Sequence, residues 1–410
     1  MSDVGPILAA MRRNKIGPLI VIVQIALTLA IISNIIAIVT ERIALITRPT
    51  GVQENQVFAL GYRLTGGEAT PSTLAADLEV IRATPGVIDA VAANGYPLRG
   101  TGWGDGISKE PGRQSIHQQS AQAAVYAMDE HAIGTLGLKL LSGRNFSSQE
   151  SIDGNLYQPP LPGVAIVSKV LANQLFPHGD ILGKTVYLTT DSSKQVVVVG
   201  VVERLQSFDV ASTVDEHASE NSIILPIHSA GQSGLFLVRA QPGLLESSMH
   251  EVQQRLAAVN PNRVFGRLRP FTEIRRTAYE KDRAMAIALS IVCAILVLVT
   301  ALGIVGVTTL WVAKRRKQIG VRRALGATRR AIVSHFLTEN ALLCCAGIGL
   351  GLLAAHSVSV WLWVHYGSDR LGAAELLICA FVVLSLGQCA AVIPAFRAAR
   401  ISPTEAFRSL

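Results

Sequence analysis

Four stretches without Asp, Glu, Lys or Arg constrain this 410-residue chain more than any other feature. A bilayer core about 30 Å thick is crossed by about 20 apolar residues in a helix, and each stretch is at least that long. We therefore expect a membrane α-helical protein with four transmembrane helices, at residues 16–40, 284–313, 340–367 and 376–396. The composition agrees, because 50% of the residues are hydrophobic and only 16% are charged.

The first stretch has a second interpretation, a cleaved signal peptide, because Arg12, Arg13 and Lys15 resemble the basic start of one. The stretch is longer than the apolar part of a signal peptide, and no small-x-small cleavage motif precedes Glu41. We expect an uncleaved anchor.

Basic residues predict the orientation of the four helices. Residues 314–330 contain eight Lys or Arg and no acid, and such short loops stay in the cytoplasm. Four spans then place residues 1–15 and 397–410 inside and residues 41–283 outside. This distribution explains the net charge of +8 without a nucleic-acid partner, and it makes membrane lipid the expected contact of the basic loops.

The outer segment, residues 41–283, has the pattern of an α/β domain. Helical periodicity occurs in residues 71–86, where Pro71 suits a first turn, and in residues 243–261. Short apolar runs bounded by turn residues predict strands at 57–60, 164–167, 186–188, 196–202, 223–227 and 235–238.

The sequence GDILGKT, Gly179 to Thr185, resembles a phosphate-binding loop, but the first Gly of that motif would have to be residue 178, which is His178. A strand is expected after it, whereas a phosphate-binding loop precedes a helix. We expect a turn here. No nucleophile, metal or cofactor motif occurs elsewhere, and all five Cys lie in the apolar stretches. We expect no catalytic, cofactor-binding or metal-binding residue and no enzymatic activity.

Residues 272–302 contain neither Gly nor Pro. They predict one helix about 46 Å long at 1.5 Å per residue, running from the outer domain into the membrane. A break near Lys281 is the alternative.

The inner segment, residues 314–339, has apolar residues at approximate helical spacing, namely Ile319, Val321, Leu325 and Ile332, with arginines between them. We expect a short amphipathic helix along the membrane. It anchors to lipid headgroups, docks a cytosolic partner, or does both.

Several long phrases of the chain resemble the MacB/FtsX family of ABC-transporter permeases. They are KRRKQIGVRRALGATRRAIVSHFLTENALLCCAGIGLGLL, IPAFRAARISPTEAFRSL, LGLKLLSGRNF, VAIVSKVLANQLFPHGDILGKTV and VVVVGVVERLQSFDV. The resemblance implies a bacterial inner-membrane protein whose outer segment is a periplasmic MacB-like core. It further implies a porter-like subdomain at about residues 50–115 and 220–272 and a sabre-like one at about 120–215.

The resemblance also implies a mechanism and partners. Two permease copies, or this chain and a paralogue, would bind two ATPase subunits and carry their ATP-driven motion to the periplasm. The inner helix would contact the ATPase through Lys317, Gln318, Gly320, Arg322, Arg323, Gly326 and Arg329; the family commonly has Glu at position 318. Since only residues 1–15 precede the first span, we expect the ATPase, with its ATP and Mg²⁺, to be a separate chain.

Dimerisation requires closely packed helices, and small residues permit it. Gly347 with Gly351, and Ala26 with Ala30, form candidate helix-packing faces, and Gln24 and Asn34 are candidate interhelical donors.

We expect export of a peptide, antibiotic or lipid-linked substrate together with a periplasmic adaptor and an outer-membrane channel. The alternatives are an FtsX-like transmitter that controls a cell-wall hydrolase or sensor, and a permease that releases lipoproteins.

Overall fold

The computed structural model describes residues 16–111, 120–154, 162–188, 195–209, 219–366 and 371–400. The chain divides into two compact units. We call residues Met1–Ile46 and Asp282–Leu410 the helical unit, and Thr47–Lys281 the α/β unit.

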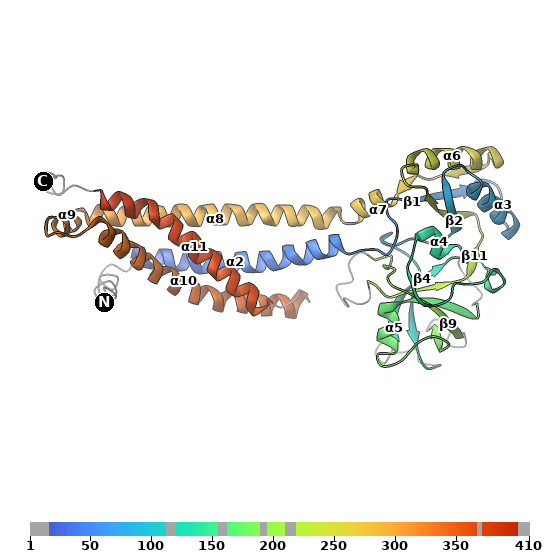
Figure 1. The fold of residues 1–410 in the computed structure, drawn as a ribbon, viewed down its shortest axis with the longest axis horizontal. Helices are drawn as coiled ribbons and strands as arrows, with labels where there is room; N and C mark the ends of the chain where they lie inside the picture. The colour runs from blue at the N-terminus through green and yellow to red at the C-terminus, as the bar shows by residue number, and fades with distance from the viewer. Residues whose placement is uncertain are drawn as a thin grey trace. The chain divides into compact units, whose positions relative to one another are not determined.

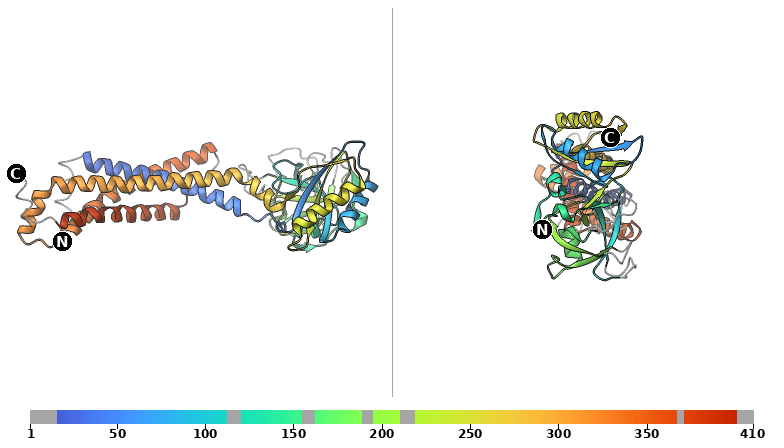
Figure 2. Two further views of the ribbon diagram at one scale, coloured as in Figure 1. Left: turned by 90° about the horizontal axis from the view of Figure 1, so that it is seen from above. Right: turned by 90° about the vertical axis from the view of Figure 1, so that its right-hand side faces the viewer.

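Among the described residues of the helical unit, four helices are long and apolar enough to cross a membrane, as predicted. They lie side by side (Figure 1, Figure 2). A short helix, α9 (Arg316–Ala324), lies between the second and third of these helices in the sequence. The four are α2 (Ile16–Thr47), α8 (Glu280–Lys314), α10 (Arg329–Tyr366) and α11 (Ala373–Ala399).

Polar side chains inside this bundle bind to neighbouring helices of the same chain. Gln24 donates to the carbonyl of Val299 on α8 at 3.1 Å, and Asn34 donates to that of Ala355 on α10 at 3.3 Å. In an apolar environment such bonds hold helices together because no water competes for the donors. The two amides predicted as interhelical donors therefore act within one chain.

Gly347 and Gly351 of α10 lie against α2. A Cβ atom on Gly347 would stand 2.8 Å from Cβ of Ile25, and one on Gly351 would stand 3.0 Å from the carbonyl oxygen of Ala26. Only a residue without a side chain permits this approach. The face considered above for dimerisation is thus covered by the chain's own first helix.

The first sheet of the α/β unit has the strand order β13-β1-β12-β2, with β14 also pairing with β1. Helices α3 (Pro71–Arg82) and α6 (Leu245–Val259) pack on it and bury Leu78 and Val252 against Phe58 and Phe236. Its strands are β1 (Val57–Leu64), β2 (Val87–Ala92), β12 (Ser233–Ala240), β13 (Arg263–Phe265) and β14 (Arg269–Pro270).

The second sheet has the order β5-β9-β7-β10-β4-β3-β8, and pairing of β8 with β9 closes six of these strands into a ring. Its interior is apolar and is covered by α5 (Lys169–Leu175). The strands are β3 (Gly104–Ser108), β4 (Ser120–Ala127), β5 (Leu140–Gly143), β7 (Val164–Ser168), β8 (Thr185–Leu188), β9 (Gln195–Val202) and β10 (Ser222–Leu225). A helical turn α4 (Ala132–Leu136) and a strand pair β6 (Ile152–Gly154) and β11 (Ile227–Ser229) complete the unit.

The division between the sheets does not follow the expected porter-like segments. Residues 104–108 and 222–225 fall in those segments, yet the strands that they form, β3 and β10, both pair with β4 in the second sheet. The partner of a strand depends on the fold of distant segments, which local sequence does not encode.

All six expected strand regions and both expected helices are present in the α/β unit. Thr70 caps α3, and Pro71 occupies its first turn. GDILGKT leads into strand β8, as predicted, and the Lys184 ammonium lies 4.3 Å from the ring centroid of Phe176. Lys184 therefore makes a local cation–π contact.

The single helix expected over residues 272–302 is wrong, and the alternative break is correct. α7 (Phe271–Ala278) ends at Tyr279, and α8 begins at Glu280. The Tyr279 side chain is fully buried, and its hydroxyl accepts a hydrogen bond of 2.9 Å from Gln206. This burial fixes Tyr279 outside regular helix geometry, at φ −100° and ψ 16°.

The two ends of the α/β unit are tied to each other. Arg275 of α7 forms an ion pair with Glu54 and also donates to the backbone carbonyl of Arg48. Both acceptors lie in the segment where the chain enters the unit, and Arg275 lies in the segment where the chain leaves it. One guanidinium therefore joins these two segments.

Candidate functional site

Helix α9 continues almost directly from α8. The N–H of Arg315 donates to Trp311 at 3.1 Å, and the N–H of Ile319 donates to Arg315 at 3.0 Å. Arg315 is thus the one residue between the helices, and its N–H donates to the last turn of α8 while its carbonyl accepts from the first turn of α9.

Gly326 ends α9. Its φ of +97° is a left-handed value that favours glycine. The N–H of Gly326 donates to Arg323 and that of Ala327 donates to Arg322, at 3.1 and 3.0 Å. These two bonds form a Schellman motif, in which the last carbonyls of a helix are satisfied.

Helix α10 starts three residues later with Thr328 as its cap, because the Thr328 hydroxyl accepts a bond of 3.2 Å from the N–H of Ala331. The amphipathic helix expected through Ile332 is therefore divided into α9 and the first turns of α10. The physical reason is the glycine stop followed by the threonine start.

One face of α9 is buried in the helical unit. Ile319 is only 6% exposed and packs with Ile332 and Phe336 of α10 and with Ala395 and Ala398 of α11. The amphipathic interpretation expected Ile319 and Ile332 to face the membrane. Both side chains are instead buried within the helical unit.

An ion pair fixes the start of α9. The Arg315 Nη1 lies 2.9 Å from Oε2 of Glu339, which is 1% exposed on α10. Arg315 also lies over the Trp311 ring, 5.8 Å from its centroid. A buried carboxylate requires such a partner, so Glu339 holds α9 to α10.

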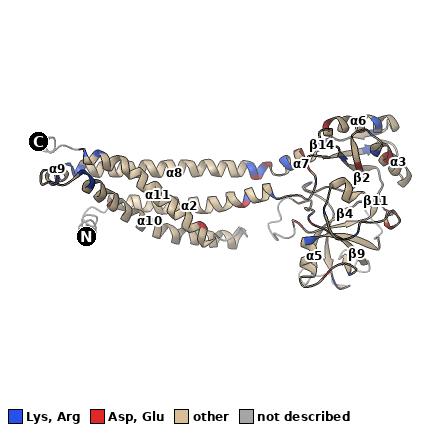
Figure 3. Ribbon diagram, viewed as in Figure 1, with Lys and Arg blue, Asp and Glu red and all other residues tan. Residues whose placement is uncertain are grey.

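The other face of α9 is exposed and carries Lys317, Gln318, Val321, Arg322 and Leu325. Leu325 is the most exposed large hydrophobic side chain among the described residues, at 83%. Lys and Arg gather at this end of the helical unit (Figure 3). An exposed apolar side chain surrounded by cations is suited to a protein contact.

The residues predicted to contact an ATPase fall into different positions. Gly320 lies on the buried face of α9, toward the bundle, and Arg323 is half-buried. Gly326 caps the helix. Lys317, Gln318 and Arg322 share the exposed face. The predicted apolar face included Leu325, and Leu325 is exposed in the structure.

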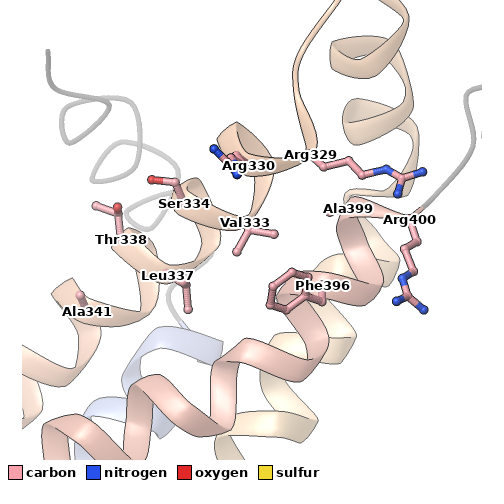
Figure 4. Close-up of a pocket in the computed structure, with 10 residues that line it drawn as sticks. All are labelled: Arg329, Arg330, Val333, Ser334, Leu337, Thr338, Ala341, Phe396, Ala399 and Arg400. Carbon is pink, nitrogen blue, oxygen red and sulfur yellow. The ribbon is translucent and has the colours of Figure 1, made fainter.

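Arg329 lies apart from that face, at the mouth of a cavity between α10 and α11 (Figure 4). The cavity has a volume of about 710 Å³. Its lining is Arg329, Arg330, Val333, Ser334, Leu337, Thr338, Ala341, Phe396, Ala399 and Arg400.

One group in the described part of the α/β unit has the donor types that a divalent metal takes. Ligand atoms of Asp129, Glu130 and His228 lie within 4.8 Å of one another. Protein donors already bind both carboxylates: the N–H of His131 donates to Asp129 at 2.9 Å, and Ser151 donates to Glu130 at 3.0 Å. Burial raises the pKa of Asp129. We interpret the group as a structural polar network.

Comparison with protein families decides the classification. Residues 16–259 match the MacB-like periplasmic core domain, and residues 290–403 match the FtsX-like permease C-terminal domain. The chain is an ABC-transporter permease of the MacB/FtsX family. The family resemblance inferred from the inner motif and the outer phrases is confirmed.

Individual relatives are distant. This MacB/FtsX permease is 25% identical over 311 residues to the ABC transporter permease YknZ of Bacillus subtilis, covering 73% of this chain and 74% of YknZ. It is 25% identical over 321 residues to the macrolide export ATP-binding/permease protein MacB of Neisseria gonorrhoeae, covering 73% of this chain and 46% of MacB. The chain thus spans about half the length of its MacB relatives.

Two solved structures are similar to part of the permease. The extracellular domain of YknZ aligns with 52% of the chain at 15% identity and a TM-score of 0.33. The periplasmic region of MacB from Actinobacillus actinomycetemcomitans aligns with 57% at 14% identity and a TM-score of 0.34.

Proposed function

We propose that this permease transmits an ATP-driven conformational change from a cytosolic ATPase to its α/β unit. The observation that carries the proposal is the two-sided character of α9. One face is packed into the bundle through Ile319, while the other presents Lys317, Arg322 and Leu325 to a partner. A partner that displaces α9 must therefore displace the bundle as well.

Helix α8 is the proposed transmission element. It contains 35 residues, about 52 Å at 1.5 Å per residue, and Arg315 links it by backbone hydrogen bonds on either side to α9. At its other end it follows Tyr279, which is anchored inside the α/β unit. Force applied at α9 would reach the α/β unit along a continuous hydrogen-bonded helix.

We further propose that the ATPase is a separate chain that binds ATP and Mg²⁺, and that this permease itself is not catalytic. Two permease copies, or this chain and a paralogue, would engage an ATPase dimer. The relative YknZ is named a permease only, whereas each MacB relative is named as one protein that is both ATP-binding and permease. The YknZ name motivates the assignment of a separate ATPase chain.

The proposed process is export of a peptide, antibiotic or lipid-linked substrate across the bacterial cell envelope. The match to a periplasmic core domain supports an inner-membrane location with the α/β unit in the periplasm and both termini in the cytoplasm. A periplasmic adaptor and an outer-membrane channel are the partners we expect for this process.

The test is copurification of the ATPase with tagged permease carrying Arg322→Glu and Leu325→Ala. Removing an exposed anchor and reversing a charge at an interface each weaken binding, so we expect a loss of about tenfold or more. The matched control is Arg63→Glu with Leu141→Ala, which changes an exposed Arg and an exposed Leu in the α/β unit.

Full ATPase recovery with the α9 variant would refute the assignment of α9. The other proteins recovered distinguish the processes: an adaptor indicates export, whereas a cell-wall hydrolase or sensor indicates FtsX-like regulation. Lipoproteins retained in the inner membrane after deletion of the permease would indicate lipoprotein release.

A further inference from the structure

The cavity between α10 and α11 has three guanidinium groups without a described partner. Arg329, Arg330 and Arg400 all line it, and no side-chain hydrogen bond or ion pair to them exists within the described residues. The lining contains no acid. Glu339, further along α10, is buried and already bound to Arg315. The cavity therefore carries positive charge that no described residue neutralises.

The rest of the lining is mainly apolar. In Figure 4, Val333 and Leu337 of α10 point into the space beside Phe396 of α11, and Arg329 and Arg400 lie at its end. Phe396 is 55% exposed. From Arg329 to Ala341 the helix rises about 18 Å at 1.5 Å per residue, and this distance leads from the charged helix ends into the charge-free part of α10.

Charge at one end and an apolar wall along a membrane helix identify the chemistry of the occupant. A soluble phosphate would neutralise the arginines but leave the apolar wall uncovered. A zwitterionic lipid would cover the wall but supply no net charge. Basic pockets between membrane helices are suited to anionic lipid headgroups, and the volume falls within the usual range of about 300–1,000 Å³ for ligand sites.

We propose that this cavity binds one anionic phospholipid. Its phosphate lies between Arg329 and Arg400 at the end of the cavity, and one acyl chain follows Val333, Leu337 and Phe396. Because its walls come from α10 and α11, the bound lipid bridges these helices next to α9. Lipid binding here requires only that these helices lie in a bilayer, and it is independent of the ATPase.

The test measures binding of dioleoylphosphatidylglycerol and dioleoylphosphatidylcholine to the purified full chain in detergent by native mass spectrometry. We expect a preference for phosphatidylglycerol. Arg329→Gln with Arg400→Gln should weaken phosphatidylglycerol binding about 25-fold, at about fivefold per arginine. The control Lys314→Gln with Arg397→Gln removes two exposed charges outside the lining and should change it less than twofold.

A second pair of variants tests the acyl chain. Ala341→Phe fills the apolar wall and should weaken phosphatidylglycerol binding, whereas Ala346→Phe, on an exposed position of α10 outside the lining, should not. Equal binding of the two lipids, or equal effects of the two arginine pairs, would overturn the proposal. If the arginine substitutions weaken phosphatidylglycerol binding but Ala341→Phe does not, the proposal is also overturned, because the cavity would then hold only a phosphate group.

Discussion

Arg144 and Glu150 form a two-point ion pair, with Nη2 of Arg144 2.6 Å from Oε1 and Nη1 2.8 Å from Oε2 of Glu150. The same carboxylate accepts a bond of 2.9 Å from the N–H of Ser147. Together these bonds close the turn after β5, and they lower the pKa of Glu150 to about 2, with the Arg144 hydrogen bond as the main cause.

This pair predicts how Glu150→Gln depends on pH. A lowered carboxylate pKa stabilises the fold above the unfolded pKa of about 4.5, and this contribution is lost as pH falls through about 2. The gap in thermal midpoint between wild type and variant should be constant from pH 7 to about 5 and shrink below about 4.5. Glu68→Gln, at an exposed position, controls for loss of charge. A gap that widens on acidification would contradict this.

Arg315→Met should destabilise the helical unit strongly. It leaves the buried Glu339 carboxylate without its ion-pair partner, which costs about 3–5 kcal/mol. Replacing both partners, as Arg315→Met with Glu339→Leu, should recover most of that loss because no buried charge remains. Thermal unfolding followed by tryptophan fluorescence tests this, since Trp311 lies beside Arg315. Equal midpoints for the single and double variants would show that the pair does not hold α9.

Gly347→Leu should lower the stability of a single chain, because its side chain would collide with Ile25 and the α2 backbone. Overpacking of this kind costs about 1–3 kcal/mol. Gly349→Leu is the matched control, since no atom lies within 4 Å of a Cβ placed there. Thermal midpoint and oligomeric state are measured together. Unchanged stability with a lost dimer would instead assign Gly347 to a contact between copies.

Gly326→Ala should loosen the end of α9. Alanine at a left-handed φ costs about 1–2 kcal/mol, so amide exchange at residues 326 and 327 should accelerate about 5- to 30-fold. Hydrogen–deuterium exchange of the full chain measures it, with Gly349→Ala as the control inside a helix. Unchanged exchange at these two amides would show that the glycine cap does not limit the stability of α9.

Local sequence predicted the elements whose causes are local. The charge-free stretches identified the spans because few other structures tolerate twenty such residues, and Thr70 with Pro71 marked the start of α3. Strands β3 and β4 were missed because GDGIS and SAQAAVYA contain small residues in place of the β-branched ones that favour strands. Their stability comes from pairing with segments distant in the chain.

Around α9, the apolar spacing did not predict which side chains are buried. Nine residues, the length of α9, are too few to define an apolar stripe, so the spacing did not separate buried Ile319 from exposed Leu325. A better signal was available in residues 326–328, where Gly and then Thr mark a helix end and a helix start. The pairing of Arg315 with Glu339 spans 24 residues, and only the packing of the helices brings the two together.

The contacts of Arg275 make the α/β unit an exchangeable cassette. Its incoming and outgoing chain ends are tied by its own side chains, Arg275 to Glu54 and to the backbone of Arg48. A permease lineage could therefore acquire a different α/β unit by recombination at these two points while keeping its helices. Such permeases would then diversify by replacement of the whole α/β unit, with the helical unit left unchanged.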